Sequence, residues 1–199
     1  MAARVEAEFM LSAASPDSFP RLRAPEIALI GRSNVGKSSL INRLVGVNGL
    51  AYTSARPGCT RTINFYRVGS PEGTLKEFRL VDLPGYGFAA GPIADKIAWK
   101  ALIDAYLTDR EDLRFALLLI DSRRGWMDAD RQMREWLEHH DRPYVVVATK
   151  IDKLNARERS SGLAAIRKEL NGRELVLFSA PEGRGVREIW HTITNITTT

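Results

Sequence analysis

The run GRSNVGKS at Gly31–Ser38 constrains the fold of this chain more than any other feature. It follows a continuous apolar run, EIALI at Glu26–Ile30, and precedes a helical pattern at Ser38–Val45. This is the strand–loop–helix order of a phosphate-binding loop, in which glycines let successive backbone N–H groups approach phosphate closely. In such a loop Lys37 reaches the β- and γ-phosphates and the Ser38 hydroxyl ligates Mg²⁺. The alternative is a glycine-rich turn that contains a lysine by chance, and it leaves the flanking patterns unexplained.

Apolar runs and helical spacing alternate along the rest of the chain. Continuous apolar runs are typical of strands covered on both faces, and six are found, at Glu26–Ile30, Ile63–Val68, Phe78–Val81, Phe115–Ile120, Tyr144–Ala148 and Leu175–Phe178. Helical spacing predicts Ser38–Val45, Ile93–Leu107, Asp128–His139, Glu158–Leu170 and Val186–Ile196. A turn at Gly69–Gly73 indicates a hairpin. The sequence therefore predicts an α/β fold with a mainly parallel six-stranded sheet, one antiparallel edge strand and helices on both faces.

Length and composition indicate one globular domain. The chain has 199 residues, of which 44% are hydrophobic and 27% charged, which excludes a wholly disordered chain, a collagen and a coiled coil. Residues 1–24 are expected to form an N-terminal extension, since Pro16 and Pro20 break any helix there, and 25–199 a nucleotide-binding domain. Cys59 is the only cysteine, which excludes an intramolecular disulfide and a four-cysteine zinc site.

Charge and hydropathy bear on location and partners. The sequence has no apolar run of the ~20 residues that a spanning helix needs, and its N-terminus lacks the pattern of a signal peptide, so we expect a cytoplasmic protein without a membrane partner. The net charge of +5 permits a polyanionic partner such as nucleic acid. Four arginines, Arg123, Arg124, Arg131 and Arg134, are compatible with an RNA-facing patch or with an ordinary solvated surface.

The sequence DLPG at Asp82–Gly85 follows the apolar run that ends at Val81. An Asp at the carboxyl end of a parallel strand lies beside the phosphate loop, where Asp82 can hold a water bound to Mg²⁺. Gly85 can then offer its backbone N–H to a γ-phosphate. Alone, DLPG could be a simple Pro-Gly turn, but the upstream phosphate loop favours the nucleotide-binding interpretation.

The sequence TKID at Thr149–Asp152 follows another predicted strand. The Asp152 carboxylate can accept hydrogen bonds from N1–H and the 2-amino group of guanine, which adenine lacks, and such mismatches discriminate by on the order of 10⁴-fold. Lys150 can lay its aliphatic stem along the base, and Ser179-Ala180 can add a backbone N–H to guanine O6. A surface turn is the alternative. The order of the motifs predicts GTP and GDP as ligands.

These motifs together resemble the EngB (YihA/YsxC) family of bacterial GTP-binding proteins, which are TRAFAC-class, Ras-like GTPases. The resemblance runs from about Glu8 to Ile196 and rests on Pro25–Asn42, Pro57-Gly58 with Thr60, Asn64-Phe65, Asp82–Gly87, Thr149–Asp152 and Phe178–Ala180. It implies a Ras-like P-loop GTPase that acts in assembly of the large ribosomal subunit, with that subunit or its rRNA as partner. It also implies a role in normal septation and cell division. Thr149, where most GTPases carry Asn, is typical of this family.

One segment departs from the family pattern. After Pro57-Gly58 the family usually has a basic residue and then Thr-Gln, whereas this chain has Cys59-Thr60-Arg61-Thr62. The resemblance identifies Thr60 as the switch I threonine that ligates Mg²⁺ in the GTP state, and makes Thr62 a less suitable substitute. By position, 47–61 is switch I and 85–92 is switch II.

The expected site residues follow from these motifs. Catalytic roles are expected for Lys37, Thr60 and Gly85, and Mg²⁺ ligation, directly or through water, for Ser38, Thr60 and Asp82. The expected nucleotide contacts are Gly31, Arg32, Ser33, Asn34, Val35, Gly36, Lys37, Ser38, Gly58, Cys59, Thr60, Arg61, Thr62, Asp82, Leu83, Pro84, Gly85, Thr149, Lys150, Ile151, Asp152, Phe178, Ser179 and Ala180.

The residue after DLPG bears on hydrolysis. Many GTPases place the attacking water with a Gln there, but this chain has Tyr86, so slow intrinsic hydrolysis is expected. Some GTPases with a hydrophobic residue at that position use the equivalent phosphate-loop Asn to bind K⁺, and this resemblance implies a K⁺ site near Asn34. The alternative is that Asn34 only stabilises the loop.

Three function classes fit parts of this pattern. The first is a monomeric GTP-hydrolysing switch that binds a ribosomal assembly intermediate. The second is a P-loop kinase or ATPase, which the complete guanine motif set disfavours. The third is a nucleotide-dependent, non-enzymatic division scaffold, which only the family resemblance separates from the first.

Overall fold

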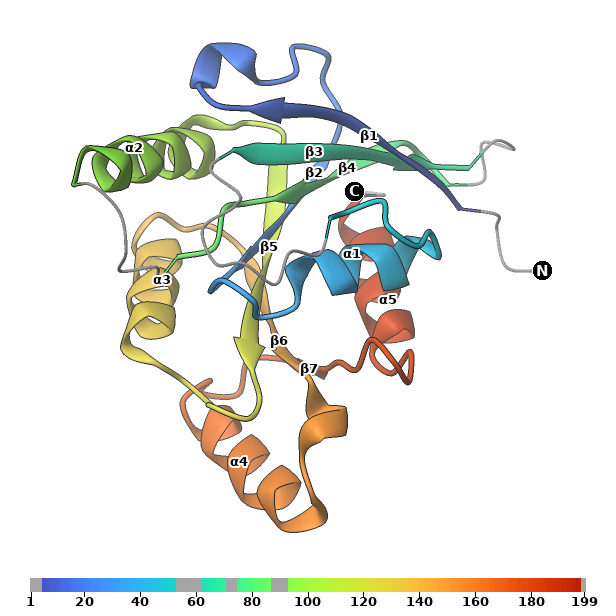
Figure 1. Cartoon of the computed structure of the whole chain (residues 1–199), viewed down its shortest axis with the longest axis vertical. Coiled ribbons are helices and arrows are strands. Elements are labelled where there is room, and N and C mark those ends of the chain that lie inside the picture. Colours follow the sequence, from blue (N-terminus) through green and yellow to red (C-terminus); the bar gives the residue numbers. More distant parts are fainter. Residues whose placement is uncertain (1–4, 53–61, 71–74, 87–92, 198–199) are drawn as a thin grey trace.

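The computed structural model describes residues 5–52, 62–70, 75–86 and 93–197. A seven-stranded sheet of order β1-β3-β4-β2-β5-β6-β7 forms its centre, with helices on both sides (Figure 1). The strands are β1 Glu6–Ala13, β2 Glu26–Gly31, β3 Ile63–Gly69, β4 Phe78–Asp82, β5 Leu113–Asp121, β6 Tyr144–Thr149 and β7 Leu175–Leu177. The α-helices are α1 Lys37–Val45, α2 Ile93–Asp109, α3 Asp128–His139, α4 Ala156–Lys168 and α5 Val186–Thr197. Two short 3-10 helices, η1 Pro16–Ser18 and η2 Ile151–Lys153, complete the described elements.

The predicted fold class is confirmed, but the predicted strand count of six is wrong. Strands β4, β2, β5, β6 and β7 are parallel, and β3 pairs antiparallel with β4. Glu6–Ala13, within the segment expected to be an extension, pairs antiparallel with β3 and becomes the edge. Half of the residues of this strand are exposed, and its register shifts between Phe9 and Leu11. It therefore lacks the continuous apolar run that predicts the other strands. The sheet therefore has two antiparallel pairings on one side, and β3 alone runs against the other strands.

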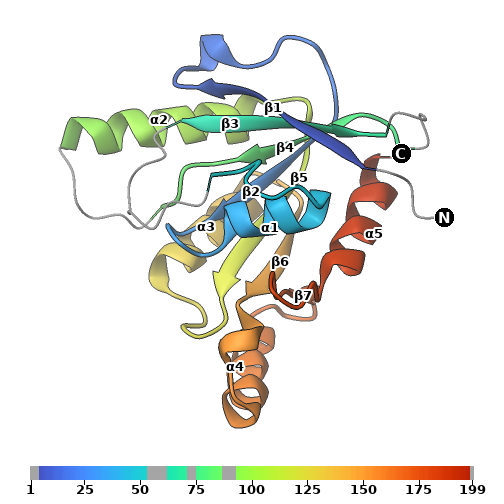
Figure 2. The ribbon, with the colours of Figure 1, turned by 45° about the vertical axis from the view of Figure 1, so that its right-hand side comes forward.

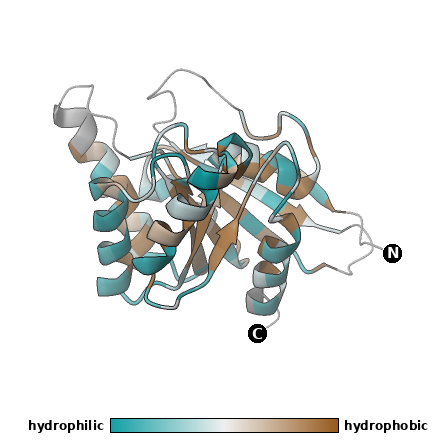
Figure 3. Ribbon diagram, turned by 90° about the horizontal axis from the view of Figure 1, so that it is seen from below, coloured by the Kyte–Doolittle hydropathy of each residue, from teal (hydrophilic) through white to brown (hydrophobic). Residues whose placement is uncertain are grey.

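Two apolar cores lie on opposite faces of the sheet. Helices α2, α3 and α4 cover one face, and α1 and α5 cover the other (Figure 2). The apolar residues of β5 contribute to both cores, because Leu118 packs into one and Leu119 into the other. Figure 3 shows the hydrophobic strands enclosed by helices whose outer surfaces are hydrophilic. This two-sided burial explains why the central strands read as continuous apolar runs.

A buried carboxylate lies at the amino end of β2, opposite the phosphate loop. Glu26 is fully buried, and its oxygens accept hydrogen bonds from Arg79 at 2.9 Å, Arg110 at 2.6 Å and the Tyr106 hydroxyl at 3.1 Å. Buried charges are tolerated when they are paired and hydrogen-bonded in this way. Glu26 therefore joins the starts of β2 and β4 to the end of α2.

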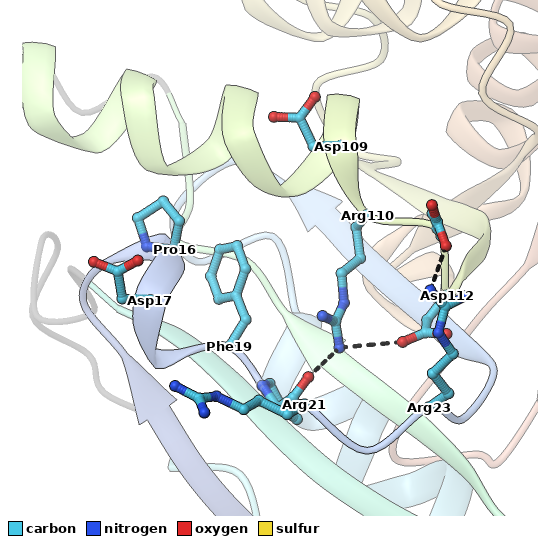
Figure 4. A pocket seen from close by; sticks show the side chains of 10 residues that line it. Pro16, Asp17, Phe19, Arg21, Arg23, Asp109, Arg110 and Asp112 are labelled. Atoms are coloured by element: carbon cyan, nitrogen blue, oxygen red, sulfur yellow. Dashed lines mark hydrogen bonds and ion pairs between the residues drawn. The ribbon is translucent and has the colours of Figure 1, made fainter.

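The same arginines hold the segment that precedes β2. Arg110 donates to the Pro20 carbonyl at 2.9 Å, and Arg79 donates to the Leu22 carbonyl. Figure 4 shows Arg110 in the hollow beside Phe19, with Asp112 as its second acidic partner at 3.4 Å. The hollow is lined by charges of both signs that pair with one another, and these pairs attach the segment before β2 to the end of α2.

We predict that Glu26→Ala lowers the free energy of unfolding by about 3–5 kcal/mol, because it leaves the Arg79 guanidinium buried without its carboxylate. Urea denaturation measures the change. Arg67→Ala is the matched control, since Arg67 pairs with Glu8 on the surface with its side chain 49% exposed, and it should cost less than about 1 kcal/mol. A loss at Glu26 no larger than the loss at Arg67 would contradict this role.

Candidate nucleotide-binding site

The predicted motifs meet at one edge of the sheet. Gly31, Asp82, Asp121 and Thr149 are the last residues of β2, β4, β5 and β6, which run parallel. A Cβ on Gly31 would come within 2.8 Å of Val35 Cγ1. Glycine is therefore required for the loop to fold back tightly over the strand that it leaves.

The phosphate loop turns through backbone conformations that favour small residues. Asn34 has φ 62° and Gly36 has φ 114°, and Gly36 caps α1, which begins at Lys37. A loop of this shape at a helix N-terminus presents backbone N–H groups to an anion. The geometry thus fits the predicted phosphate site.

Lys37 and Asp82 form a buried pair at the loop. Lys37 Nζ lies 3.9 Å from Asp82 Oδ1, and the two side chains are 10% and 7% exposed. Burial raises the pKa of Asp82 to about 6, opposed by the Lys37 charge, and burial lowers the pKa of Lys37. Asp82 Oδ1 has no hydrogen-bond partner among the described residues. A buried carboxylate oxygen without a hydrogen-bond partner, beside the lysine of the phosphate loop, fits a hard cation and its bound water.

Gly85 packs directly against the phosphate loop. A Cβ at this position would lie 2.6 Å from Ser33 N and 2.8 Å from Ser33 Cα. The next residue, Tyr86, accepts a hydrogen bond on its carbonyl from Ser33 N–H at 3.3 Å. The start of the predicted switch II therefore touches the loop, and only glycine permits the approach.

Thr149 fastens the end of β6 to the loop. Its hydroxyl is 2.7 Å from the Val35 carbonyl oxygen and 3.1 Å from the Ile120 carbonyl oxygen, and the residue is 1% exposed. The position that carries Asn in most GTPases thus uses a hydroxyl to hold the phosphate loop from behind.

Lys150 makes the second contact between β6 and the loop. The residue has a left-handed backbone conformation with φ 59°. Its Nζ donates to the Asn34 carbonyl at 2.5 Å and to Asp121 Oδ2 at 2.9 Å. Arg123 holds the same carboxylate through Nε at 2.9 Å and Nη2 at 2.6 Å. Burial opposes ionisation of Asp121, but the hydrogen bonds from Arg123 and Lys150 outweigh it and lower its pKa to about 2. The sequence reasoning missed Asp121 and its link to Lys150, although an Asp directly after the apolar run of β5 was a usable signal.

The two predicted base-reading segments lie together. The Ser179 hydroxyl donates to Asp152 Oδ1 at 2.9 Å, and Ile151 N–H donates to the Phe178 carbonyl at 3.4 Å. Ser179 is fully buried, so its hydroxyl fixes the carboxylate that is expected to meet guanine.

The expected switch I residues Gly58, Cys59, Thr60 and Arg61 lie outside the described residues, as does switch II from residue 87 onward. The described ends of switch I are both fastened. The Asn42 side chain bonds the backbone of Ala51 in both directions, at 2.9 Å and 2.7 Å. Beyond the gap, the Thr62 hydroxyl donates to Asn64 at 3.2 Å.

Most of the predicted arginine patch is engaged within the domain. Arg131 pairs with Glu169 at 2.9 Å, and Arg134 lies over the Trp126 ring at 4.8 Å. With Arg123 bound to Asp121, Arg124 is the one arginine of the four without a side-chain hydrogen bond or ion pair to the described part of the chain. Within that part, no helix is long and apolar enough to span a bilayer.

Comparison with known proteins decides the family. A family model for "50S ribosome-binding GTPase" matches residues 26–150. A probable GTP-binding protein EngB from Solibacter usitatus is 57% identical over 190 residues, which cover 96% of this chain and 95% of the relative. This chain belongs to the EngB family of GTP-binding proteins. An EngB relative from Desulforamulus reducens is 46% identical over 93% of this chain and 89% of its own length.

Solved structures agree with this family assignment. A crystal structure of a probable GTP-binding protein EngB aligns with TM-score 0.64 at 28% identity, covering 87% of this chain and 98% of that one. Era from Aquifex aeolicus bound to GDP·AlF₄⁻ aligns with TM-score 0.70 at 26% identity, and the alignment covers 88% of this chain and 57% of that one. The predicted resemblance is confirmed, and with it a GTPase domain of Ras-like fold whose ligand is a guanine nucleotide.

We predict that Thr149→Val destabilises the protein by about 1–2 kcal/mol and lowers GDP affinity several-fold, because the carbonyls behind the phosphate loop lose a buried donor. Urea unfolding and fluorescent-GDP titration measure the two effects. Thr192→Val is the control, since among the described residues the Thr192 hydroxyl donates only to the Glu188 carbonyl, within α5 and on an exposed face. If both variants bind GDP as the wild type does, Thr149 has no part in shaping the loop.

Proposed function

We propose that this protein is a Mg²⁺-dependent GTP-hydrolysing switch that acts in assembly of the large ribosomal subunit. The observation that carries the switch is the contact of Gly85 with Ser33, because it places the start of switch II against the phosphate loop. A γ-phosphate bound at that loop can therefore move or hold the segment that follows. The ribosomal partner is supported by the description of the matching family model, "50S ribosome-binding GTPase".

Each group of predicted site residues has a separate proposed role in GTP binding and hydrolysis. Lys37 neutralises charge on the β- and γ-phosphates, and Gly85 donates its backbone N–H to the γ-phosphate. Ser38, Asp82 and Thr60 would hold Mg²⁺, directly or through water, and the bound ion would neutralise charge at the phosphates. Asp152 and Lys150 select and hold the guanine base, with Ser179 and Ala180 beside them.

Slow intrinsic hydrolysis is proposed because no amide is available where many GTPases carry Gln. The Tyr86 hydroxyl donates to Asp130 at 2.8 Å, and it is thus engaged away from a water-positioning role. The Asn34 side chain makes no hydrogen bond to the described residues, so its amide oxygen is available for K⁺ beside the phosphates. A cation there supplies the charge that an arginine finger supplies elsewhere.

The cellular role is proposed on the same family grounds. We propose a monomer in the cytoplasm whose GTP-bound form engages the large subunit or its rRNA, with normal septation and cell division depending on that activity. A structure of Era, to which this fold is similar, holds nucleotides 1506–1542 of 16S ribosomal RNA. The net charge of +5 is compatible with an RNA partner. The alternative, a non-enzymatic division scaffold, predicts nucleotide-dependent polymers in sedimentation, whereas a switch stays monomeric.

Co-sedimentation with purified large ribosomal subunits tests the proposal. We expect binding with a non-hydrolysable GTP analogue and much weaker binding with GDP, because the γ-phosphate is needed to set switch II. The preference should persist when salt is raised, since it depends on a specific surface. Binding that ignores the nucleotide and disappears with salt would be nonspecific attraction of a basic protein to RNA and would contradict the proposal.

The K⁺ site is tested by the GTPase rate in KCl and in NaCl at equal ionic strength. We expect about tenfold faster hydrolysis in KCl, in line with one added charge contact at the phosphates. Asn34→Gly should lose the difference while keeping GDP affinity, because glycine accepts the φ of 62° found at this position. Equal rates in both salts for the wild type would remove K⁺ from the mechanism.

A further inference from the structure

Tyr86 is fixed by two bonds that lead to different parts of the fold. Its hydroxyl donates to Asp130 Oδ1 at 2.8 Å, and its carbonyl accepts from Ser33 N–H at 3.3 Å. The residue is only 7% exposed although switch II begins there. The side chain is therefore anchored to α3 and the backbone to the phosphate loop.

Asp130 is a rigid acceptor for this bond. It lies in the first turn of α3 and is 2% exposed. Its second oxygen accepts the Met127 N–H at 3.1 Å and so caps the helix. Because this capping bond fixes the carboxylate at the helix terminus, the other oxygen can hold the Tyr86 hydroxyl at a defined place.

The phosphate loop also contacts the residues around Tyr86 and the start of α3. Arg32 Nη1 lies 2.6 Å from Met127 Sδ, and the Arg32 backbone forms a parallel bridge with Tyr86. These contacts thus join the loop, the start of switch II and the start of α3. Any shift of Tyr86 would carry Gly85 with it, since the two residues share a peptide bond, and Gly85 lies so close to Ser33 that a side chain has no room between them.

We propose that Tyr86 and Asp130 are a positioning pair that holds the Gly85 N–H where it meets the γ-phosphate. The proposal rests on the proposed function, in which Gly85 distinguishes GTP from GDP. The role of Tyr86 then differs from that of the usual Gln, because Tyr86 sets the geometry of the γ-phosphate contact from behind and does not touch the water. Loss of the pair should weaken binding of GTP and leave binding of GDP unchanged, because only GTP carries the γ-phosphate that Gly85 is proposed to bind.

Tyr86→Phe tests the pair, because it keeps the buried ring and removes only the hydroxyl. We would measure the Kd of GDP and of a non-hydrolysable GTP analogue with Mg²⁺ by displacement of fluorescent GDP. We expect the affinity for the GTP analogue to be about tenfold weaker than in the wild type, since the loss of one hydrogen bond to a charged acceptor has an effect of this order. The affinity for GDP should change less than twofold. The matched control is Tyr106→Phe, which removes a buried tyrosine hydroxyl from the Glu26 carboxylate at the opposite end of β2. It should leave the ratio of the two Kd values unchanged.

Asp130→Ala and the double variant complete the cycle. If the pair is the source of the effect, Tyr86→Phe should change the Kd ratio by less than twofold in the Asp130→Ala background. A wild-type ratio in Tyr86→Phe would overturn the proposal, and so would parallel loss of affinity for both nucleotides, which a merely structural bond predicts. If Tyr86→Phe folds poorly, two Asp130 variants keep the test available. Asp130→Asn retains a hydrogen-bonding group at this position and should keep the wild-type ratio of the two Kd values. Asp130→Ala should lose that ratio, and this difference would support the pair. Failure of the wild type itself to prefer guanine nucleotides would instead refute the proposed function.

Discussion

The attachment of the phosphate loop to the end of β6 is the contact on which the site depends. A loop that turns its N–H groups toward phosphate leaves carbonyl oxygens on its other side, and these need donors when they are buried. Thr149 and Lys150 supply those donors to Val35 and Asn34. Because the same short segment continues to Asp152, the predicted phosphate loop and the residue expected to read the base are fixed relative to each other.

The other half of the site depends on close backbone approach and on a buried pair of opposite charges. Gly85 lies so near Ser33 that any side chain would collide with the loop, which couples the start of switch II to whatever the loop binds. Lys37 and Asp82 lie 3.9 Å apart, nearly excluded from water and without a hydrogen bond between them. Such a pair is costly alone. In the proposed function, phosphate and a cation would stabilise it, and the binding energy of the ligand would be linked to the order of the site.

The sequence was sufficient for the parts that depend on local patterns. Two-sided burial makes the central strands continuous apolar runs, and the motifs follow these strands directly, so their meeting at one sheet edge could be predicted. Strand β1 could not, because its half-exposed residues mimic an extension and its pairing with β3 joins segments that lie far apart in the chain. The Tyr86–Asp130 and Lys150–Asp121 contacts were also missed, since each joins residues from different elements. The four arginines were compatible with a partner surface, yet Arg131 is held by Glu169, a pairing that depends on how α3 and α4 pack.

The central claim is that the phosphate loop and the segments at Thr149–Asp152 and Ser179 form one guanine-specific site. Competition between fluorescent GDP and unlabelled GDP or ADP, with Mg²⁺ present, tests it most directly. The account predicts that ADP needs on the order of 10⁴-fold higher concentration than GDP, because adenine leaves the Asp152 carboxylate without donors. Displacement by ADP at concentrations similar to those of GDP would contradict it.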